Sequence, residues 1–598
     1  MNGRGVKRGI DFDVLKQELA DTLIDERELR YQFTWPDKQK SVLLANTPTN
    51  KTLRPCKEES VDFDSTQNLY IEGDNLEVLK LLQETYLGKI KMIYIDPPYN
   101  TGNDFVYNDD FSQEADEYKE NSGQFDEYGN RLFQNTESNG RFHTDWLNMI
   151  YPRLRLAKDL LSDDGVIFIS IDDNEVDNLS AICNEVFGKG NFIAKFIWEK
   201  TANPNSTWNN IGIVHEYILC YSKTATQLNL LELKPNDLDK YTGTDEYLSK
   251  RGPFKLVGLN KTGTLSDQRP NLQYEIVAPD GTIILPQPRW RWSLETFEKG
   301  IKENRVVFKE TQGKWSVYYK QYLFEDNFGN KVERGNLVFT ILNSLGRTTN
   351  GANELSGLLN KGVFDFPKPS SLIKHFIKIA TQQNSTILDF FSGSATTAHA
   401  VMQLNAEDGG NRKFIMVQLP EPCDEKSEAY KAGYKNICEI GKERIRRAGA
   451  KIKQENGLTA QDLDTGFRVL KLDSSNMKDV YYRPEEYSQS MLEGLADNIK
   501  PDRTTLDLLF QVMLGLGKPL SAKIEEREIA GKIVFNADDG DLIACFEDSI
   551  SAEIVTEIAK AKPLYAVFRD SGLSSDSVAA NFEQIFATYS PGTVRKVL

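Results

Sequence analysis

Short apolar runs bounded by turn residues alternate with amphipathic stretches in two separate parts of the chain. The runs predict buried strands at 68–72, 91–95, 166–171, 192–198 and 217–221, with helical periodicity between them at 76–86 and 146–161. The alternation then resumes with helices at 370–379, 396–404 and 425–447 and strands at 386–388 and 413–419. Strands that alternate with helices predict an α/β fold, with a doubly wound and mostly parallel sheet.

The two alternating parts are separated by a segment of different character. Residues 222–365 have short alternating apolar runs and many Gly, Pro and Asn residues, which predicts an inserted mixed α+β domain. A charged amphipathic helix is predicted at 11–31. We therefore expect an N-terminal helical and irregular segment at 1–65 and a core in two halves, at 66–221 and 366–465. The insert at 222–365 separates these halves, and a small C-terminal assembly domain follows at 466–598.

Charge is concentrated in segments of the chain. The 598 residues carry a formal net charge of −16, which by itself opposes a nucleic-acid partner, because Lys and Arg supply affinity for phosphates. However, residues 103–140 hold ten acidic and two basic side chains, and residues 481–598 hold nineteen acidic and twelve basic ones. Residues 251–320, inside the insert, have twelve basic and seven acidic side chains. The insert is therefore the part expected to face a polyanion.

Composition argues against several classes of protein. The chain has no run of about 18 apolar residues, so no membrane span is expected. The N-terminus lacks the apolar region of a secretory signal. The six cysteines are scattered without a Cys-x-x-Cys pair, and the chain has only four histidines. Neither a disulfide framework nor a metal site is expected, and the cysteine usage is typical of a reducing, cytoplasmic setting.

The first candidate site consists of Asp96, Pro97, Pro98 and Tyr99, directly after the strand predicted at 91–95. Ligands of open α/β sheets bind beyond the carboxyl ends of the strands. The prolines remove two N–H donors and leave carbonyl groups that can accept. The exocyclic amino group of a flat base could donate to Asp96 and to the Pro97 carbonyl, with Tyr99 stacked on the ring. Taken alone, the tetrapeptide could also be a plain strand-end turn.

The second candidate site follows the strand predicted at 386–388. It comprises Asp389, Phe390, Phe391, Ser392, Gly393 and Ser394 and leads into a helix. Small residues let a ligand approach the backbone, and the start of a helix offers N–H groups. The segment is neither a Walker A loop nor G-x-G-x-x-G, so by itself it could be an ordinary strand-to-helix turn.

These two motifs, in this chain order, carry a resemblance. The chain resembles the β-group of amino-directed, S-adenosylmethionine-dependent DNA methyltransferases, in which D-P-P-Y precedes and F-x-G-x-G follows an inserted target-recognition domain. More closely, it is similar to the modification (Mod) subunits of type III restriction–modification systems. The segments that support this are 70–111, 142–154, 165–175, 215–223, 388–401, 413–422 and 466–476. The resemblance implies a Rossmann-like methyltransferase core.

The resemblance also implies a cofactor site. The turn from Asp389 to Ser394 would border S-adenosylmethionine, Lys368 would lie near its methionine end, and Asp74 would lie beside its adenine. The acid that usually binds the ribose is replaced here by Gln418, with Glu421 three residues further on, and either could take the ribose. Alanine stands at the family's last glycine, position 395.

The implied reaction is methylation of adenine N6 in double-stranded DNA. The target base is flipped out of the duplex, hydrogen bonds localise electron density on N6, and the nitrogen attacks the sulfonium methyl in line. Two alternatives remain: cytosine-N4 methylation, which also uses an exocyclic amine, and a DNA-recognition subunit with an inactive cofactor pocket. Cys56 and Cys423 follow prolines, but neither stands where a cytosine-C5 nucleophile would.

Further expectations concern partners. Arg289, Trp290, Arg291 and Trp292 mix bidentate donors with stacking rings, which suits DNA contact, although Arg and Trp alternating on a half-exposed strand would look the same. The family implies a homodimer that joins a Res subunit for ATP-driven cleavage, in the bacterial cytosol at the nucleoid. No Walker A loop is found in this chain, which agrees with that division of labour.

Overall fold

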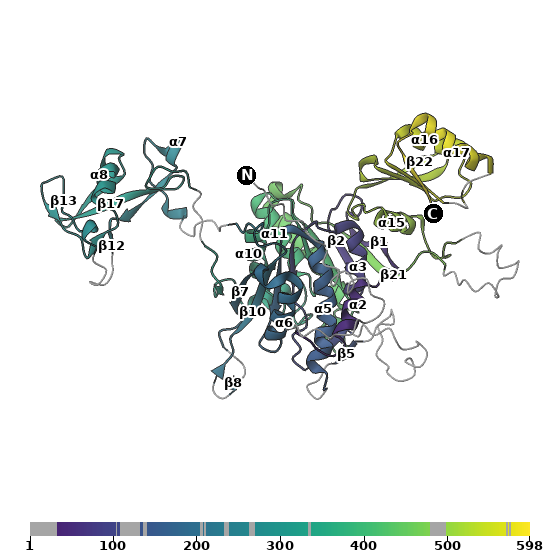
Figure 1. Cartoon of the computed structure of the whole chain (residues 1–598), viewed down its shortest axis with the longest axis horizontal. Helices are drawn as coiled ribbons and strands as arrows, with labels where there is room; N and C mark the ends of the chain where they lie inside the picture. The colour runs from purple at the N-terminus through teal and green to yellow at the C-terminus, as the bar shows by residue number, and fades with distance from the viewer. Residues whose placement is uncertain are drawn as a thin grey trace, which may run out of the picture. The chain divides into compact units, whose positions relative to one another are not determined.

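A computed structural model of the chain describes residues 33–102, 105–107, 132–134, 140–203, 207–208, 211–231, 238–261, 269–332, 337–478, 498–569, 572 and 576–598. They form two compact units, one of residues up to 231 together with 339–598, and the other of residues 232–338 (Figure 1). The helix expected at 11–31 and most of the acidic stretch 103–140 lie outside the described residues.

The larger unit is built on a ten-stranded sheet with the order β1-β21-β2-β20-β19-β3-β6-β10-β7-β18. The strands are β1 (Lys51–Val61), β2 (Leu69–Glu72), β3 (Ile90–Ile95), β6 (Leu161–Ile171), β7 (Phe192–Glu199), β10 (His215–Ser222), β18 (Ile341–Leu342), β19 (Thr386–Asp389), β20 (Lys413–Gln418) and β21 (Phe467–Ser474). The pairings are parallel except for β1 with β21 and β10 with its two neighbours. The predicted mostly parallel α/β sheet is confirmed.

Helices cover both faces of this sheet (Figure 1). One layer contains α3 (Asn75–Tyr86), α5 (Phe142–Leu160) and α6 (Val176–Cys183), and the other contains α10 (Ser370–Ala380), α11 (Thr396–Asp408) and α13 (Ile437–Asn456). On β3, Ile93 and Ile95 belong to the core with the first layer, whereas Tyr94 stacks on Phe376 of α10 at 6.5 Å between ring centroids. Buried side chains alternate between the two layers, so the sheet is doubly wound.

The prediction of one continuous helix at 425–447 is wrong, because this segment contains two helices. It consists of α12 (Glu428–Lys431) and α13, separated by a turn in which Gly433 has a φ of 98°. That left-handed conformation ends the first helix, and glycine adopts it at no steric cost. The second helix starts at Asn436, whose side chain accepts a hydrogen bond from the N–H of Glu439 at 3.1 Å.

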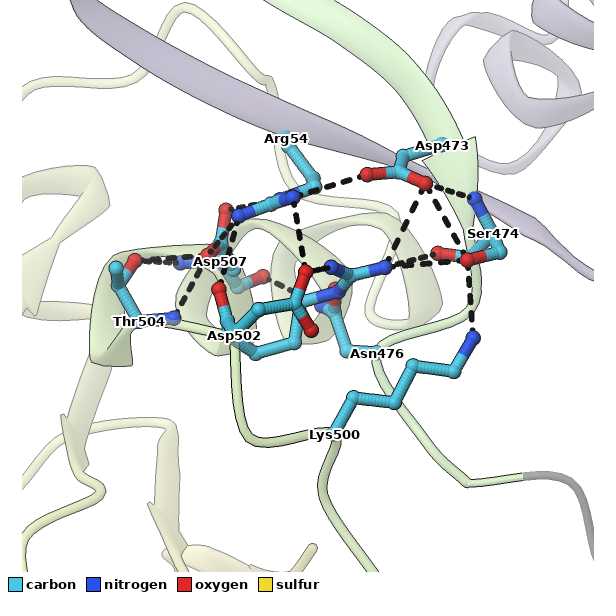
Figure 2. A network of polar contacts seen from close by, with 9 residues as sticks. Arg54, Asp473, Ser474, Asn476, Lys500, Asp502, Thr504 and Asp507 are labelled. Carbon is cyan, nitrogen blue, oxygen red and sulfur yellow. Dashed lines mark hydrogen bonds and ion pairs between the residues drawn. The ribbon is translucent and has the colours of Figure 1, made fainter. Parts of the chain in front are cut away.

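A polar network joins β1 and β21 to α15 (Thr505–Gly515) (Figure 2). Arg54 on β1 donates to both carboxylate oxygens of Asp507 at 3.1 and 3.3 Å, and to Asp473 on β21 at 2.9 Å. Asp507 also accepts from the backbone N–H of Thr504 at 2.7 Å and closes a capping box at the start of α15. The side chain of Asp507 is only 3% exposed. Arg54 therefore compensates the charge of a buried carboxylate, and this carboxylate also caps the N-terminus of α15.

Further elements of this unit lie near the two ends of the chain. Among the described residues, α2 (Lys38–Asn46) packs against α5, and a five-stranded sheet follows α15. Its strands are β22 (Ile524–Ile529), β23 (Lys532–Ala537), β24 (Leu542–Cys545), β25 (Tyr565–Phe568) and β26 (Val594–Val597), with helices α16 (Ala552–Ala561) and α17 (Asp576–Tyr589). Because β21 pairs with β1 and β2, the core sheet extends to Ser474, beyond the boundary expected at 466.

The smaller unit, 232–338, lies within the insert expected at 222–365. It contains a three-stranded antiparallel sheet of β11 (Phe254–Gly258), β17 (Lys314–Tyr322) and β16 (Val306–Thr311), together with helix α8 (Leu294–Lys302). Residues 339–365, expected in the insert, instead belong to the larger unit, where Ile341 pairs with Ile197 on β7. In the part of the chain that is described, no helix is long and apolar enough to cross a membrane.

Candidate active site

The two candidate motifs lie at the carboxyl ends of neighbouring strands. β19 and β3 are adjacent and parallel, with Ile387 opposite Met92, and the chain continues from β19 towards β20 on one side and from β3 towards β6 on the other. This reversal of strand order is the topological switch point at which open α/β sheets bind ligands. Residues 96–99 and the turn 389–394, far apart in the sequence, thus meet at one edge of the sheet.

Asp96 is held in an ion pair with Lys368. The ammonium of Lys368 lies 2.8 Å from each carboxylate oxygen, and it also donates to the Tyr99 hydroxyl at 2.9 Å. Burial disfavours the charge on Lys368, but Asp96 and Glu216 outweigh burial and raise the pKa of its ammonium. Lys368, expected near the methionine end of the cofactor, is therefore placed against the target-base motif.

Tyr99 links the two carboxylates around this lysine. Its hydroxyl donates to Asp96 at 2.8 Å and lies 3.2 Å from Glu216 on β10. Burial, followed by the charge of Asp96, raises the pKa of Tyr99 well above its usual value, so the phenol stays protonated. Glu216 is also paired with Lys200 at 3.2 Å, and the two lysines outweigh burial and lower its pKa.

The backbone after Asp96 is fixed in an open turn. The indole of Trp146 donates to the Pro98 carbonyl at 2.7 Å, and Asn100 has a φ of 61°, with its amide donating to Glu175 at 2.6 Å. The Pro97 carbonyl has no hydrogen-bond partner among the described residues. This group is the acceptor that an exocyclic amino group would need.

The turn after β19 is held by hydrogen bonds to its own first residue, Asp389. Asp389 accepts from the N–H of Phe391 at 3.1 Å and from the Thr397 hydroxyl at 2.6 Å, and burial raises its pKa to about 7. Gly393 has a φ of 50°, and Ala395 takes up a left-handed conformation with a φ of 61° where α11 begins. The alanine at the family's last glycine therefore adopts a glycine-like backbone.

The side chains of this turn are buried. Phe390 and Phe391 are buried in the hydrophobic core, so only their backbone could border a ligand. The hydroxyl of Ser394 accepts from Arg444 at 3.0 Å, and the guanidinium of Arg444 is fully buried behind the turn. The sequence gives no signal that Arg444, which lies 50 residues after Ser394, supports this turn.

Gln418 and Glu421 have different surroundings. Gln418 accepts from the N–H of Gly393 at 2.7 Å and donates to the Leu419 carbonyl at 3.2 Å, so both ends of its amide are engaged. Glu421 has a partly buried carboxylate with no hydrogen-bond or ion-pair partner among the described side chains and backbone groups, and burial raises its pKa to about 7. Glu421 is therefore the residue with acceptor capacity for a ligand.

Asp74 begins helix α3. Its carboxylate accepts from the N–H of Glu77 at 3.1 Å and pairs with the buried Arg153 at 3.0 Å. Next to it, the amide of Asn75 donates to the Phe390 carbonyl at 2.7 Å and joins this segment to the turn after β19. Nothing in the sequence pattern pointed to Arg153, which lies 79 residues further along the chain.

The expectation that residues 289–292 bind DNA requires a correction. Arg289, Trp290 and Trp292 are only 5%, 2% and 6% exposed, and both indoles belong to the core of unit 232–338. The indole of Trp290 donates to the Tyr274 carbonyl, and Trp292 packs on Tyr319 at 4.6 Å between ring centroids. These rings have no face available for a base, and of the four only Arg291 is exposed.

We expect Trp290→Ala and Arg291→Ala to separate packing from DNA contact. Loss of the buried indole should lower the free energy of unfolding of unit 232–338 by about 3–5 kcal/mol, seen as faster hydrogen–deuterium exchange in the full chain. Arg291→Ala should leave exchange unchanged and weaken DNA binding, with a salt slope reduced by about 1. Unchanged exchange with Trp290→Ala would contradict the core placement.

No group of three or more His, Cys, Asp or Glu side chains within the described ranges is arranged to hold a metal ion. The switch point brings together two carboxylates, one free carbonyl and one phenol around a lysine, next to a glycine-containing turn at the start of a helix.

Comparison with known proteins gives consistent matches. The family described as DNA methylase (N6_N4_Mtase) matches residues 90–448. The chain is 35% identical over 472 residues to the type III restriction–modification enzyme StyLTI Mod subunit of Salmonella typhimurium strain LT2. This match covers 77% of the present chain and 69% of that subunit. It is 34% identical over 505 residues to the EcoP15I Mod subunit of Escherichia coli (76% of each chain), and 35% identical over 468 residues to the EcoPI Mod subunit of Escherichia phage P1 (74% and 71%).

Proposed function

The chain belongs to the DNA methylase family and, within it, to the modification subunits of type III restriction–modification enzymes, and from this premise we propose that residues 96–99 and the turn 389–394 form its active site. It is an S-adenosylmethionine-dependent DNA methyltransferase that acts on N6 of adenine. The observation that carries the site assignment is the adjacency of β3 and β19, which brings the two motifs to one switch point.

In the proposed mechanism, Asp96 and the Pro97 carbonyl accept the two hydrogens of the adenine amino group. These hydrogen bonds localise the nitrogen lone pair, and Tyr99 provides an aromatic surface for the flipped base. Holding the nucleophile in line can account for roughly 7–11 kcal/mol of the barrier. Asp96 is then placed to accept the proton that the methylated nitrogen releases.

S-adenosylmethionine supplies an electrophilic methyl group on a positively charged sulfur. The residues present fit such a molecule, because the turn that contains Gly393 leads into the start of α11, and the Glu421 carboxylate has no partner among the described residues and could accept from ribose hydroxyl groups. We assign the ribose to Glu421, since Gln418 already uses both ends of its amide within the turn. Asp74, Asp389 and the backbone of 390–394 complete the proposed cofactor site.

This assignment predicts a pH dependence of cofactor affinity. Only the ionised form of Glu421 accepts two hydroxyl hydrogens, and its pKa is raised to about 7, so affinity should rise with pH. From pH 6 to pH 8 we expect the dissociation constant, measured by calorimetry, to fall by about tenfold.

Glu421→Gln should remove most of this dependence. The matched control is Glu425→Gln, an exposed acid four residues away, which should keep it. If the dependence survives in Glu421→Gln and disappears in Asp389→Asn, the titrating group is Asp389, whose pKa is also raised to about 7, and the ribose assignment fails.

The base specificity can be tested directly in cells. DNA from bacteria that express the chain should carry N6-methyladenine at one short sequence, mapped by single-molecule sequencing. A methylcytosine mark would support N4 chemistry instead, and DNA without any mark would support a recognition subunit with an inactive pocket.

The proposed assembly is supported by the relatives. Three of them are Mod subunits of type III enzymes, so we propose that this chain binds double-stranded DNA, forms a homodimer and joins a Res subunit in the bacterial cytosol at the nucleoid. In this proposal, unit 232–338 selects the DNA sequence. Size-exclusion chromatography with light scattering would detect the dimer, and co-purification with a Res chain would detect the complex.

A further inference from the structure

Lys368 and the target base compete for the same acceptor. The ammonium of Lys368 is bound to both oxygens of Asp96 at 2.8 Å, and the Tyr99 hydroxyl donates to one of them. A carboxylate has about four acceptor positions, so three are already taken. An ammonium in direct contact also neutralises the charge that would polarise an amino group.

A second carboxylate lies within reach of the same lysine. Glu216 is 3.5 Å from the Lys368 ammonium and is only 8% exposed, while Lys368 itself is 9% exposed. Glu216 also contacts Lys200 at 3.2 Å, and the side chain of Lys200 is 29% exposed. The cluster therefore holds two carboxylates and two ammonium groups, and it stays neutral whichever carboxylate Lys368 contacts more closely.

We propose that Lys368 is a placeholder: it occupies the amino-group position on Asp96 in the DNA-free enzyme and moves onto Glu216 when the flipped adenine arrives. Glu216 is then a positioning residue, which holds Lys368 away from Asp96 during methyl transfer. This inference rests on the proposed role of Asp96 as the acceptor for N6.

The geometry suits such an exchange. The ammonium needs a displacement of under an ångström to bring its 3.5 Å separation from Glu216 to hydrogen-bond distance. The Tyr99 hydroxyl lies between the two carboxylates, at 2.8 and 3.2 Å, and can serve either. Before the base arrives, the ion pair gives the partly buried carboxylate of Asp96, whose side chain is 29% exposed, a counter-charge.

A double-mutant cycle tests the placeholder. In Glu216→Gln, Asp96 is the only carboxylate left for Lys368, so the lysine should stay on Asp96 and kcat should fall by about 100-fold. Lys368→Met removes the competitor and should lower kcat by less than about tenfold. The double variant should match Lys368→Met and not Glu216→Gln, so that loss of the lysine rescues loss of the glutamate.

The matched control is a different lysine–glutamate pair, which joins α10 to α11. Lys374 lies 2.5 Å from Glu407 on α11, and Lys374→Met, Glu407→Gln and their double variant should leave kcat unchanged. Single-turnover rates on DNA that carries the mapped site report kcat, and calorimetric binding of S-adenosylmethionine shows that each variant is folded.

The outcomes are distinct. A double variant as inactive as Glu216→Gln, or worse, would overturn the placeholder and show that both side chains merely support the site. Full activity of Glu216→Gln would also overturn it. If Asp96→Asn is fully active, the failure lies with the proposed function itself.

Discussion

Asp96→Asn is expected to lower kcat for DNA methylation by about a thousandfold. The amide presents N–H groups where the adenine amino group needs an acceptor, and its oxygen carries no full charge to draw the N6 hydrogens. The side chain keeps its size and an oxygen for Lys368, so the fold and the affinity for S-adenosylmethionine should be retained. Transfer of a labelled methyl group in a single turnover measures the first quantity, and calorimetry measures the second.

Asp163→Asn is a suitable control for this experiment. Asp163 lies on β6, next to β3. Its side chain is 72% exposed and makes a long ion pair of 3.9 Å with Lys223. Its replacement should leave both quantities unchanged. An Asp96→Asn enzyme within about tenfold of the unmodified rate, which is a difference of only 1.4 kcal/mol in the barrier, would show that Asp96 does not hold the amino group.

Arg54→Ala is expected to destabilise the larger unit by about 3 kcal/mol, because it leaves the buried carboxylate of Asp507 without its counter-charge. The same carboxylate caps α15, so the helix should loosen together with the ion pair (Figure 2). Chemical denaturation followed by circular dichroism gives the change, and hydrogen–deuterium exchange should rise first at the start of α15.

Lys57→Ala provides the comparison on the same strand. Lys57 pairs with Glu526 at 2.7 Å, but both side chains are more than a third exposed, and such a pair contributes at most about 1 kcal/mol. Equal losses from the two substitutions would mean that burial of Asp507 is not the source of the effect. Exchange confined to β1 would contradict the link to α15.

Apolar periodicity predicts the buried strands because each of them is a short run of consecutive apolar residues. The expectations at 68–72 and 91–95 correspond to β2 and β3, and that at 413–419 corresponds to β20. Strand β1, KTLRPCKEESV, was missed because it lies at an edge of the sheet, and its residues carry charges that find partners on β21 and α15. Its pairing with a segment more than 400 residues away has no signal in a single sequence.

The site shows the same limit. D-P-P-Y and the glycine turn are local motifs, so the sequence alone locates both. The ion pair of Lys368 with Asp96, which are 272 residues apart, depends on how the strands are ordered. The Arg-Trp repeat failed for the opposite reason: a local pattern that suits DNA equally suits a packed core, and only tertiary burial distinguishes the two.

The position of the insert has an evolutionary consequence. Asp96, Tyr99, Lys200 and Glu216 precede unit 232–338 in the chain, and Lys368 and the cofactor turn follow it, so none of the proposed chemistry resides within it. Under the proposal that this unit selects the DNA sequence, recombination that exchanges it between relatives would alter which sequence is marked and leave the methyl-transfer machinery complete. A bacterial lineage could therefore acquire a new specificity in one step, without passing through an inactive enzyme.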